Sequence, residues 1–464
     1  MQKIVIKNFG AIKEAEIEVK KILVLIGEQA SGKSTIAKLI YFFKSLRDDL
    51  FNQVYKDNLK DYFDNVSDLI FPIREKFYDF FGSTFHLKEF EILFYYDIEK
   101  DKYLKLTLDI NKKLHPFFSR NFLSTNFKTS AGQIKKLLQQ GNSNTKIHEQ
   151  LAHEQNKIKY AQRLSILVND LFESHQDDSL FVIAGRNATV SYSELFERYL
   201  FASIQNRLEE NSKQTFKRKQ QTIDETLMLQ FMERVVKVKE TFKKFDNFAG
   251  LTNSYLVEDK ERKLLSFVEE KVSEILKGKY LIDSWGEKIV YNSSSEYVYL
   301  SNASSGQQES VRILQDIFLN IMDNTKCLRI IEEPEAHLFP VAQKHIIELL
   351  SLMVNMNDDN QLIITTHSPY VLTVFNNLLF ANRVANTNSE LKEEVSKVIS
   401  ECFWLNSNVF SAYSLNENDE LNCKTILDPN TSLIDQNYLD TVSELLSEDF
   451  GHLYSLHSKS FLRK

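Results

Sequence analysis

Apolar residues follow two different periods at the start of the chain. Through residues 2–19 they recur mainly at every second position, whereas residues 22–26 read ILVLI without a polar residue. The alternation predicts two half-buried strands, and the continuous run predicts a strand buried on both faces. Helical spacing then predicts a helix from Lys33 to about Leu46, and similar spacing near the other end predicts one from Asn437 to about Leu456.

The middle of the chain changes pattern several times. Residues 88–110 place a charged EKDK turn between two alternating segments, which predicts a β-hairpin. Residues from about 112 to 178 and from 191 to 278 are polar with helical periodicity, and between them the run Phe181–Ala184 predicts a short buried strand. Residues 279–300 contain further strand-like runs.

Strand–helix alternation resumes after residue 300 and continues to about 380, where a mixed tail begins. The whole pattern predicts an α/β fold in which residues 1–111 and 279–464 form the two halves of one body. Residues 112–278 are then a mostly helical insertion, from which the strand at 181–187 is expected to return to the body.

Composition narrows the class of protein. Only 12 Gly and 6 Pro occur among 464 residues, too few for a disordered, collagen-like or turn-rich all-β chain. With 57 basic and 64 acidic side chains the net charge is −7, which argues against a globally basic nucleic-acid binder. The three cysteines have no CxxC spacing, so neither a disulfide scaffold nor a zinc site of that kind is expected. Without a signal peptide or a long apolar run, we expect a cytoplasmic protein with no membrane contact.

A phosphate-binding loop follows the buried strand. The motif GxxxxGK[ST] stands between a strand and an apolar helix, which is the context that it requires. Its glycines let backbone N–H groups face one anion, and the helix N-terminus adds its positive end. Lys33 is expected to reach the β- and γ-phosphates of ATP, and the Ser34 hydroxyl to bind Mg²⁺. The expected nucleotide-binding residues are Gly27, Glu28, Gln29, Ala30, Ser31, Gly32, Lys33, Ser34 and Thr35.

Two adjacent carboxylates, Glu332 and Glu333, end the apolar run at 328–331. A carboxylate at a strand tip beside a phosphate loop can hold Mg²⁺, and the next one can orient or deprotonate the attacking water. We therefore assign Glu332 to the metal and Glu333 to catalysis. Alone, such a pair is more often a solvated strand end, and it is the upstream phosphate loop that favours the catalytic interpretation.

Two further segments carry polar residues at the boundaries of elements. The sequence ASSGQ opens a segment with helical periodicity, where a Ser-Gly turn makes either a second anion site or an ordinary helix N-cap. Its candidate residues are Ser304, Ser305, Gly306 and Gln307. His367 follows the strand-like run QLIITT, where a neutral imidazole could hydrogen-bond the γ-phosphate and take part in catalysis.

In this order, the segments resemble the ATP-binding cassette (ABC) ATPases of the SMC type. Residues 27–34 match the Walker A loop. Residues 303–307 resemble the LSGGQ signature, with Ser305 in place of its first glycine. Residues 330–333 match the Walker B strand, with Glu332 in place of the usual Asp.

The remaining positions refine this resemblance. Residues 335–338 lie where the D-loop belongs and His367 matches the switch histidine, but no glutamine stands where the Q-loop ligand belongs. The sequences EEPEAHLFP and TTHSPYVL most resemble the ATPase heads of the overcoming-lysogenisation-defect group and of PtuA-type proteins in the Septu anti-phage system. Residues 181–187 (FVIAGRN) resemble the IPAxR segment of these relatives.

The resemblance implies a Mg²⁺-dependent ATPase head that binds ATP between the protomers of a head-to-tail homodimer or a larger oligomer. Ser304 and Gly306 of the opposite protomer would close each site, since glycine allows the backbone to approach the γ-phosphate. It also implies a sensor or scaffold subunit in anti-phage defence that controls a separately encoded effector, such as an HNH nuclease. We expect no nuclease domain in the chain itself, because fewer than 100 residues follow His367 and no strand-anchored DxD appears.

Two alternative functions stay open: a nucleotide-gated oligomeric scaffold with little turnover, and a DNA-repair or chromosome-maintenance ATPase that contacts DNA through the insertion. Two other signals are weaker. His148 and His153 resemble a metalloprotease motif, but their spacing puts them on different faces of a helix. A basic cluster is more often a solvated helix face than a nucleic-acid contact, and it comprises Lys213, Lys217, Arg218 and Lys219.

Overall fold

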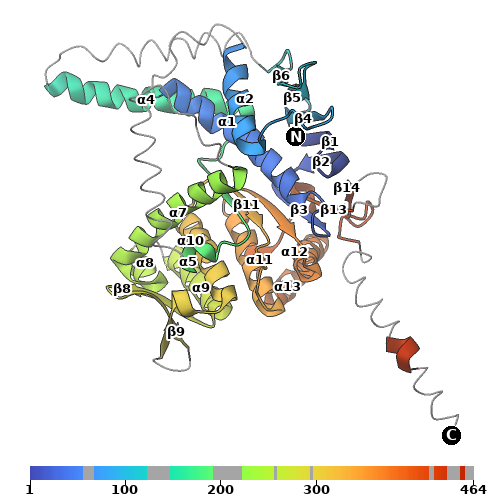
Figure 1. Ribbon diagram of the computed structural model, residues 1–464. Coiled ribbons are helices and arrows are strands. Elements are labelled where there is room, and N and C mark those ends of the chain that lie inside the picture. The colour runs from blue at the N-terminus through green and yellow to red at the C-terminus, as the bar shows by residue number, and fades with distance from the viewer. Residues whose placement is uncertain are drawn as a thin grey trace.

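The chain forms three β-sheets with helices packed between and around them (Figure 1). The computed structural model describes residues 1–55, 67–122, 147–191, 222–254, 259–292, 296–416, 423–435 and 450–454.

A six-stranded sheet lies at the centre of the fold, in the order β14-β13-β3-β12-β11-β7. Neighbouring strands run parallel except for the edge pair β13 and β14. These strands come from both ends of the chain, and β7 from its middle pairs with β11. The strands are β3 (Ile22–Gly27), β7 (Asp178–Val182), β11 (Cys327–Glu332), β12 (Gln361–Thr366), β13 (Phe410–Leu415) and β14 (Cys423–Thr425). The predicted α/β fold class, with a head built from both ends of the chain, is confirmed.

Both faces of the central sheet are covered, which explains the unbroken apolar run of β3. In β3, Ile22 and Val24 join the hydrophobic core on one face, while Leu23 and Leu25 join the core on the other. The second of these cores lies between the central sheet and an antiparallel sheet with the order β2-β1-β4-β5-β6.

Helix α1 (Lys33–Tyr55) fills the space between these two sheets. Its Ile36 and Phe43 are fully buried, and the Phe43 ring stacks on Phe94 of β4 with 5.0 Å between ring centroids. Two further helices add side chains to the same core: α2 (Ser67–Phe81) and α4 (Ile147–Phe172). The strands of the second sheet are β1 (Gln2–Phe9), β2 (Ile12–Val19), β4 (Glu91–Asp97), β5 (Lys102–Leu108) and β6 (Leu114–Phe118).

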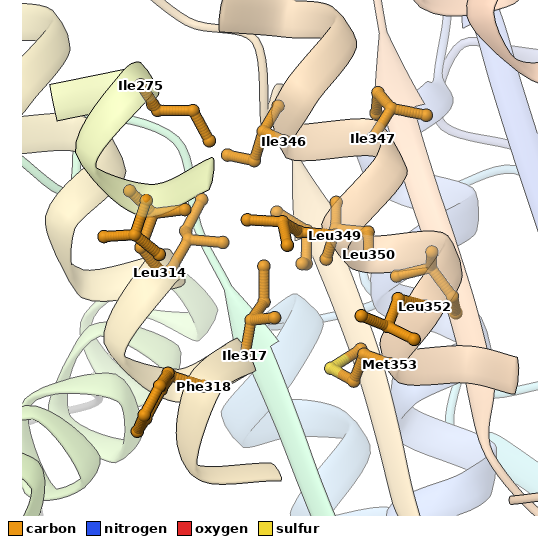
Figure 2. Close-up of a cluster of buried hydrophobic side chains, with 14 of the residues drawn as sticks. Ile275, Leu314, Ile317, Phe318, Ile346, Ile347, Leu349, Leu350, Leu352 and Met353 are labelled. Atoms are coloured by element: carbon orange, nitrogen blue, oxygen red, sulfur yellow. The ribbon is translucent and has the colours of Figure 1, made fainter. Parts of the chain in front are cut away.

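Helices α9, α10 and α11 cover the opposite face of the central sheet. Figure 2 shows their side chains meeting, with Ile275 from α9, Leu314 and Ile317 from α10, and Ile346 and Leu350 from α11. A small three-stranded sheet, β8-β9-β10, precedes α10 in the chain. The helices are α5 (Ala188–Ser191), α7 (Ile223–Phe245), α8 (Phe248–Ser254), α9 (Asp259–Leu276), α10 (Ser305–Asp323), α11 (Pro340–Asn355), α12 (Pro369–Thr387) and α13 (Lys392–Val398). The small strands and 3-10 turns are β8 (Gly278–Asp283), β9 (Gly286–Tyr291), β10 (Tyr297–Tyr299), η1 (Leu300–Asn302), η2 (Ser389–Leu391), η3 (Glu401–Phe403) and η4 (Ser407–Val409).

Several elements differ from the sequence-based expectation. Strand β7 spans Asp178–Val182, so most of the segment 181–187 that was expected to form it lies in the turn that follows. Residues Leu114–Phe118 form strand β6 instead of a helical segment. The strand contains Pro116, and proline argues against a strand in sequence-based prediction. Proline is tolerated here because β6 lies at the edge of its sheet. Helix α1 continues to Tyr55. Strands β13 and β14 lie in the tail beyond residue 380, where no strand was expected.

The helix expected from 437 to 456 lies mostly outside the described residues. Its described part, residues 450–454, is helical. In the part of the chain that the structure describes, no helix has both the length and the apolar character needed to cross a membrane.

A buried ion pair ties the small sheet to α10. Arg312 of α10 donates hydrogen bonds to both carboxylate oxygens of Glu287 in β9, at 2.5 and 2.8 Å, and the Tyr280 hydroxyl donates a third at 2.7 Å. Burial alone would raise the pKa of Glu287, but the charges of Arg312 and Lys239 outweigh it and lower this pKa to about 2. A carboxylate with a depressed folded-state pKa stabilises the protein above its unfolded pKa, and this stability is lost as the pH falls through the folded value.

We expect the free energy of unfolding to fall as the pH decreases from about 5 to about 2, and Glu287→Gln to remove part of this dependence. The variant should also lose about 3 kcal/mol at pH 7, because Arg312 stays buried without a carboxylate partner. Urea unfolding at a series of pH values measures both effects. Asp283→Asn, which changes an exposed acid on neighbouring β8, is the control and should leave the free energy of unfolding at pH 7 nearly unchanged. An unchanged pH slope in Glu287→Gln would contradict this account.

Candidate functional site

Two glycines shape the loop between β3 and α1. At Gly27 a Cβ atom would lie 2.2 Å from the carbonyl oxygen of Leu415 in β13, so only glycine fits. At Gly32 the φ angle is +100°, which residues with a side chain rarely adopt. The loop leads directly into the first turn of α1 at Lys33. Backbone N–H groups of that turn have no partner within the helix and can bind an anion.

The Lys33 ammonium group lies inside this loop. Lys33 is 5% exposed, and its Nζ donates hydrogen bonds to the carbonyl oxygens of Gly27 at 2.8 Å and Glu28 at 2.6 Å. Burial lowers the pKa of Lys33, and the negative charges of Glu333 and Glu335 oppose that shift. A phosphate group in the loop would add the strong negative partner that a buried ammonium group favours.

Glu332, the last residue of β11, has a buried carboxylate in which only one oxygen accepts a hydrogen bond. Its Oε2 accepts a hydrogen bond from the Ala184 N–H at 3.1 Å, whereas its Oε1 is buried without a hydrogen-bond partner. An unsatisfied buried carboxylate oxygen is costly, and a divalent cation or one of its waters would satisfy it. Glu332 therefore fits a Mg²⁺ site, since Mg²⁺ prefers oxygen ligands.

Glu333 turns toward the phosphate loop. Its φ angle is +45°, a left-handed conformation that costs a residue other than glycine about 1–2 kcal/mol. The Glu333 N–H donates to the Thr365 carbonyl oxygen at 2.9 Å, which ties the turn to the end of β12. The side chain is partly exposed, and its Oε1 lies 2.9 Å from Nε2 of His367.

His367 connects this carboxylate to the phosphate loop. Its Nδ1 lies 3.0 Å from the Gly27 carbonyl oxygen and 3.5 Å from the Lys33 Nζ. The carboxyl ends of β3, β11 and β12 thus bring Lys33, Glu333 and His367 together. Such an edge of a parallel sheet is where open α/β folds bind their ligands.

Two residues to which sequence reasoning gave no role are buried at this site. The Oε1 of Glu335 accepts hydrogen bonds from the Thr366 hydroxyl at 2.5 Å and from the His367 N–H at 3.0 Å, and burial raises the pKa of Glu335. Arg186 is fully buried behind the turn at Glu333. The signal that could have revealed Arg186 is its place in the segment 181–187, which resembles the IPAxR motif and puts an arginine two positions after the apolar run 181–184.

The segment 304–307 contacts other parts of the head. Ser304 is the N-cap of α10 and forms a capping box with Gln307, so the ordinary N-cap interpretation describes the folded chain. A Cβ at Gly306 would lie 2.6 Å from the carbonyl oxygen of His337, so the chain's own packing requires glycine there, whatever binds outside. Ser304 and Ser305 are exposed. The described hydrogen bonds of this segment stay within α10 or reach Leu276, and none reaches the phosphate loop.

Two of the weaker signals lie beyond what the structure describes. His148 and His153 are on α4, but their side chains are outside the described residues, and so is the basic cluster at 213–219. Within the described ranges, no group of three or more His, Cys, Asp or Glu side chains is placed to hold a metal ion by itself.

The parallel sheet, its glycine-shaped loop and the buried lysine define a P-loop nucleotide-binding head. The sequence matches the family described as an AAA ATPase domain over residues 1–372, so the chain belongs to this family. No match was found among curated proteins.

Solved structures with low sequence identity are similar to the chain. The SMC head domain from Thermotoga maritima is 10% identical, with 80% of this chain and 90% of that chain covered and a TM-score of 0.32. The recombination mediator RecF is 10% identical over 89% of this chain and 95% of its own, with a TM-score of 0.30. The dimeric bacterial ABC transporter cassette MJ0796 is 12% identical over 81% and 91%, with a TM-score of 0.26.

Proposed function

We propose that this protein is an ABC-type ATPase that binds and hydrolyses Mg²⁺-ATP at the edge of its central sheet. The observation that carries the proposal is the contact of His367 with both the phosphate loop and Glu333, which joins a phosphate-binding element to a carboxylate. ATP hydrolysis needs this combination, because the triphosphate must be held while a water molecule is activated beside it.

Each residue has a defined part in this reaction. Lys33 and the N–H groups of residues 27–35 bind the phosphates. Ser34 and Glu332 would hold Mg²⁺, which would supply positive charge to neutralise the charge that develops on the phosphates. Glu333 accepts a proton from the attacking water, and the contact of its Oε1 with His367 Nε2 orients it. To contact the γ-phosphate, His367 would exchange one of its two ring-nitrogen contacts, with Gly27 or with Glu333, for the phosphate.

The nucleotide lies between two protomers in this proposal. Ser304 and Ser305 are exposed at the start of α10, and their hydrogen bonds leave them apart from the phosphate loop of their own chain. The N-terminus of α10 offers backbone donors and a positive helix end, with which Ser304–Gln307 of an opposite protomer would complete the site in a head-to-tail dimer.

The biological role proposed first is that of a sensor or scaffold subunit in an anti-phage complex that controls a separate effector, such as an HNH nuclease. It is supported by the resemblance of residues 332–340 and 365–372 to that group. A DNA-repair ATPase is an equal alternative, and duplex binding that weakens steeply with salt would favour it. Glu332 and Ser305, which depart from the family pattern, favour a third reading: a nucleotide-gated scaffold. Turnover that Glu333→Gln leaves unchanged would support that reading.

Lys33→Ala should abolish nucleotide binding while the fold stays intact, because it removes the positive charge that faces the triphosphate. Titration with a fluorescent ATP analogue measures binding, and circular dichroism checks the fold. Unchanged affinity in the variant would contradict the phosphate-loop assignment.

Glu333→Gln should retain ATP binding and slow hydrolysis at least about 100-fold, the usual effect of removing a positioned base. Glu332→Gln should instead weaken the dependence of turnover on Mg²⁺ concentration. Steady-state phosphate release at several Mg²⁺ concentrations measures both variants. If the two phenotypes are exchanged, the metal and base assignments are wrong by one residue.

Two inactive variants should form one intact site when mixed. Ser305→Glu places a negative charge where the partner's phosphates would lie, whereas Gly306 is unsuitable for this test because its Cβ would strike His337 of its own chain. A mixed dimer with Lys33→Ala contains one doubly altered site and one unaltered site. Size-exclusion chromatography with a slowly hydrolysed ATP analogue should therefore show dimers only in the mixture. No trapped dimer, despite free subunit exchange, would refute the shared site.

A further inference from the structure

We propose that Arg186 is a positioning residue that holds the turn at Glu333 in its left-handed conformation and links this turn to α10. The proposal deepens the proposed function, since it rests on Glu333 as the base of that reaction.

The contacts of one guanidinium group carry the inference. Arg186 is 0% exposed and lies in the turn that follows β7. Its NH1 donates to the Glu332 carbonyl oxygen at 2.9 Å, and its NH2 donates to the Glu333 carbonyl oxygen at 2.8 Å. These two carbonyl groups belong to the peptide planes on either side of the Glu333 Cα atom.

Fixing both of these planes fixes the backbone conformation of Glu333, because φ and ψ are the rotations between them. The guanidinium group is planar and rigid, so its two N–H donors define one orientation of the two carbonyls. The hydrogen bond from the Glu333 N–H to the Thr365 carbonyl oxygen adds a third constraint. A strained conformation persists only where its surroundings hold it in this way, and here it points the carboxylate at His367.

The same guanidinium group reaches α10. Its Nε donates to the Glu309 carbonyl oxygen at 3.1 Å and lies 3.3 Å from the Glu309 Oε2. The short helix after Arg186 adds a second link, in which the Ser191 hydroxyl donates to the Gln308 Oε1 at 3.1 Å. Arg186 thus joins the turn at Glu333 to α10 at Glu309, directly after the first turn of that helix, which carries the candidate anion site.

Arg186→Lys in the full chain tests the proposal, because lysine keeps the charge but cannot donate to both carbonyls in a fixed plane. We expect nucleotide affinity within about twofold of the original and kcat lowered at least about tenfold. Arg329→Lys is the matched control. Arg329 is also a fully buried arginine, which lies within β11 and pairs with Asp178 and Asp316. The kcat of the Arg329→Lys variant should stay within about twofold of that of the original protein.

A double variant separates positioning from general damage to the fold. If Arg186 acts through Glu333, adding Arg186→Lys to Glu333→Gln should lower kcat less than about twofold further. A further tenfold loss in the double variant, or an equal loss in Arg329→Lys, would overturn the proposal.

Hydrogen exchange of the nucleotide-free protein tests the linkage without hydrolysis. Arg186→Lys should speed exchange at the Glu333 amide and at residues 305–309 at least about tenfold, and Arg329→Lys should leave both unchanged. If the protein does not hydrolyse ATP, the proposed function fails, whereas this measurement still decides whether Arg186 holds the turn. If Arg186→Lys does not fold, Glu309→Gln should raise exchange at Glu333 at least about threefold. Unchanged exchange at Glu333 in the variant that folds would overturn the linkage.

Discussion

The parallel pairing of β3 with β12, and of β12 with β11, is the constraint on which the candidate site depends. Ile26 pairs with Thr366 and Glu332 pairs with Thr365, so the three strands end at nearly the same level of the sheet. A shift of one residue in β11 would exchange the directions of Glu332 and Glu333, because successive side chains point to opposite faces. Hydrophobic cores on both faces of the sheet resist such a shift, since it would also turn the apolar residues of β11 to the wrong sides.

Charge at this edge of the sheet is unevenly balanced. Two buried cations, Lys33 and Arg186, lie among four carboxyl groups, which are Glu309, Glu332, Glu333 and Glu335. Arg186 compensates part of this excess of negative charge through Glu309, and burial raises the pKa of Glu335. A triphosphate adds further negative charge, so a divalent cation beside Glu332 is the natural electrostatic complement of the loaded site.

Local sequence patterns were sufficient to predict most of the site. The phosphate loop, the two carboxylates and His367 each stand at the end of a short, mainly apolar strand, and parallel strands bring their carboxyl ends to one edge. The segment that contains Arg186 was recognised, but the role of this side chain could not be predicted from local patterns. Its partners are backbone carbonyl groups 146 and 147 residues away, and every residue has a carbonyl group. The sequence pattern explained the glycine at 306 by the close approach of a phosphate bound to the opposite protomer. In the structure, the backbone of His337 in the same chain leaves no room for a side chain at this position. Strand β13 was missed because its pairing with β3 joins segments nearly 400 residues apart.

The contact between Gly27 and Leu415 has a consequence for the order in which the protein is made. The phosphate loop leaves the ribosome long before the strand against which it packs, because β3 and β13 lie nearly 400 residues apart in the sequence. Pairings between such distant segments form slowly, and N-terminal segments generally fold first during synthesis. While the residues between the two strands are made, a nascent chain therefore carries the Walker motif without the neighbouring strand that shapes it. Competence to bind nucleotide is acquired only after β13 has been translated.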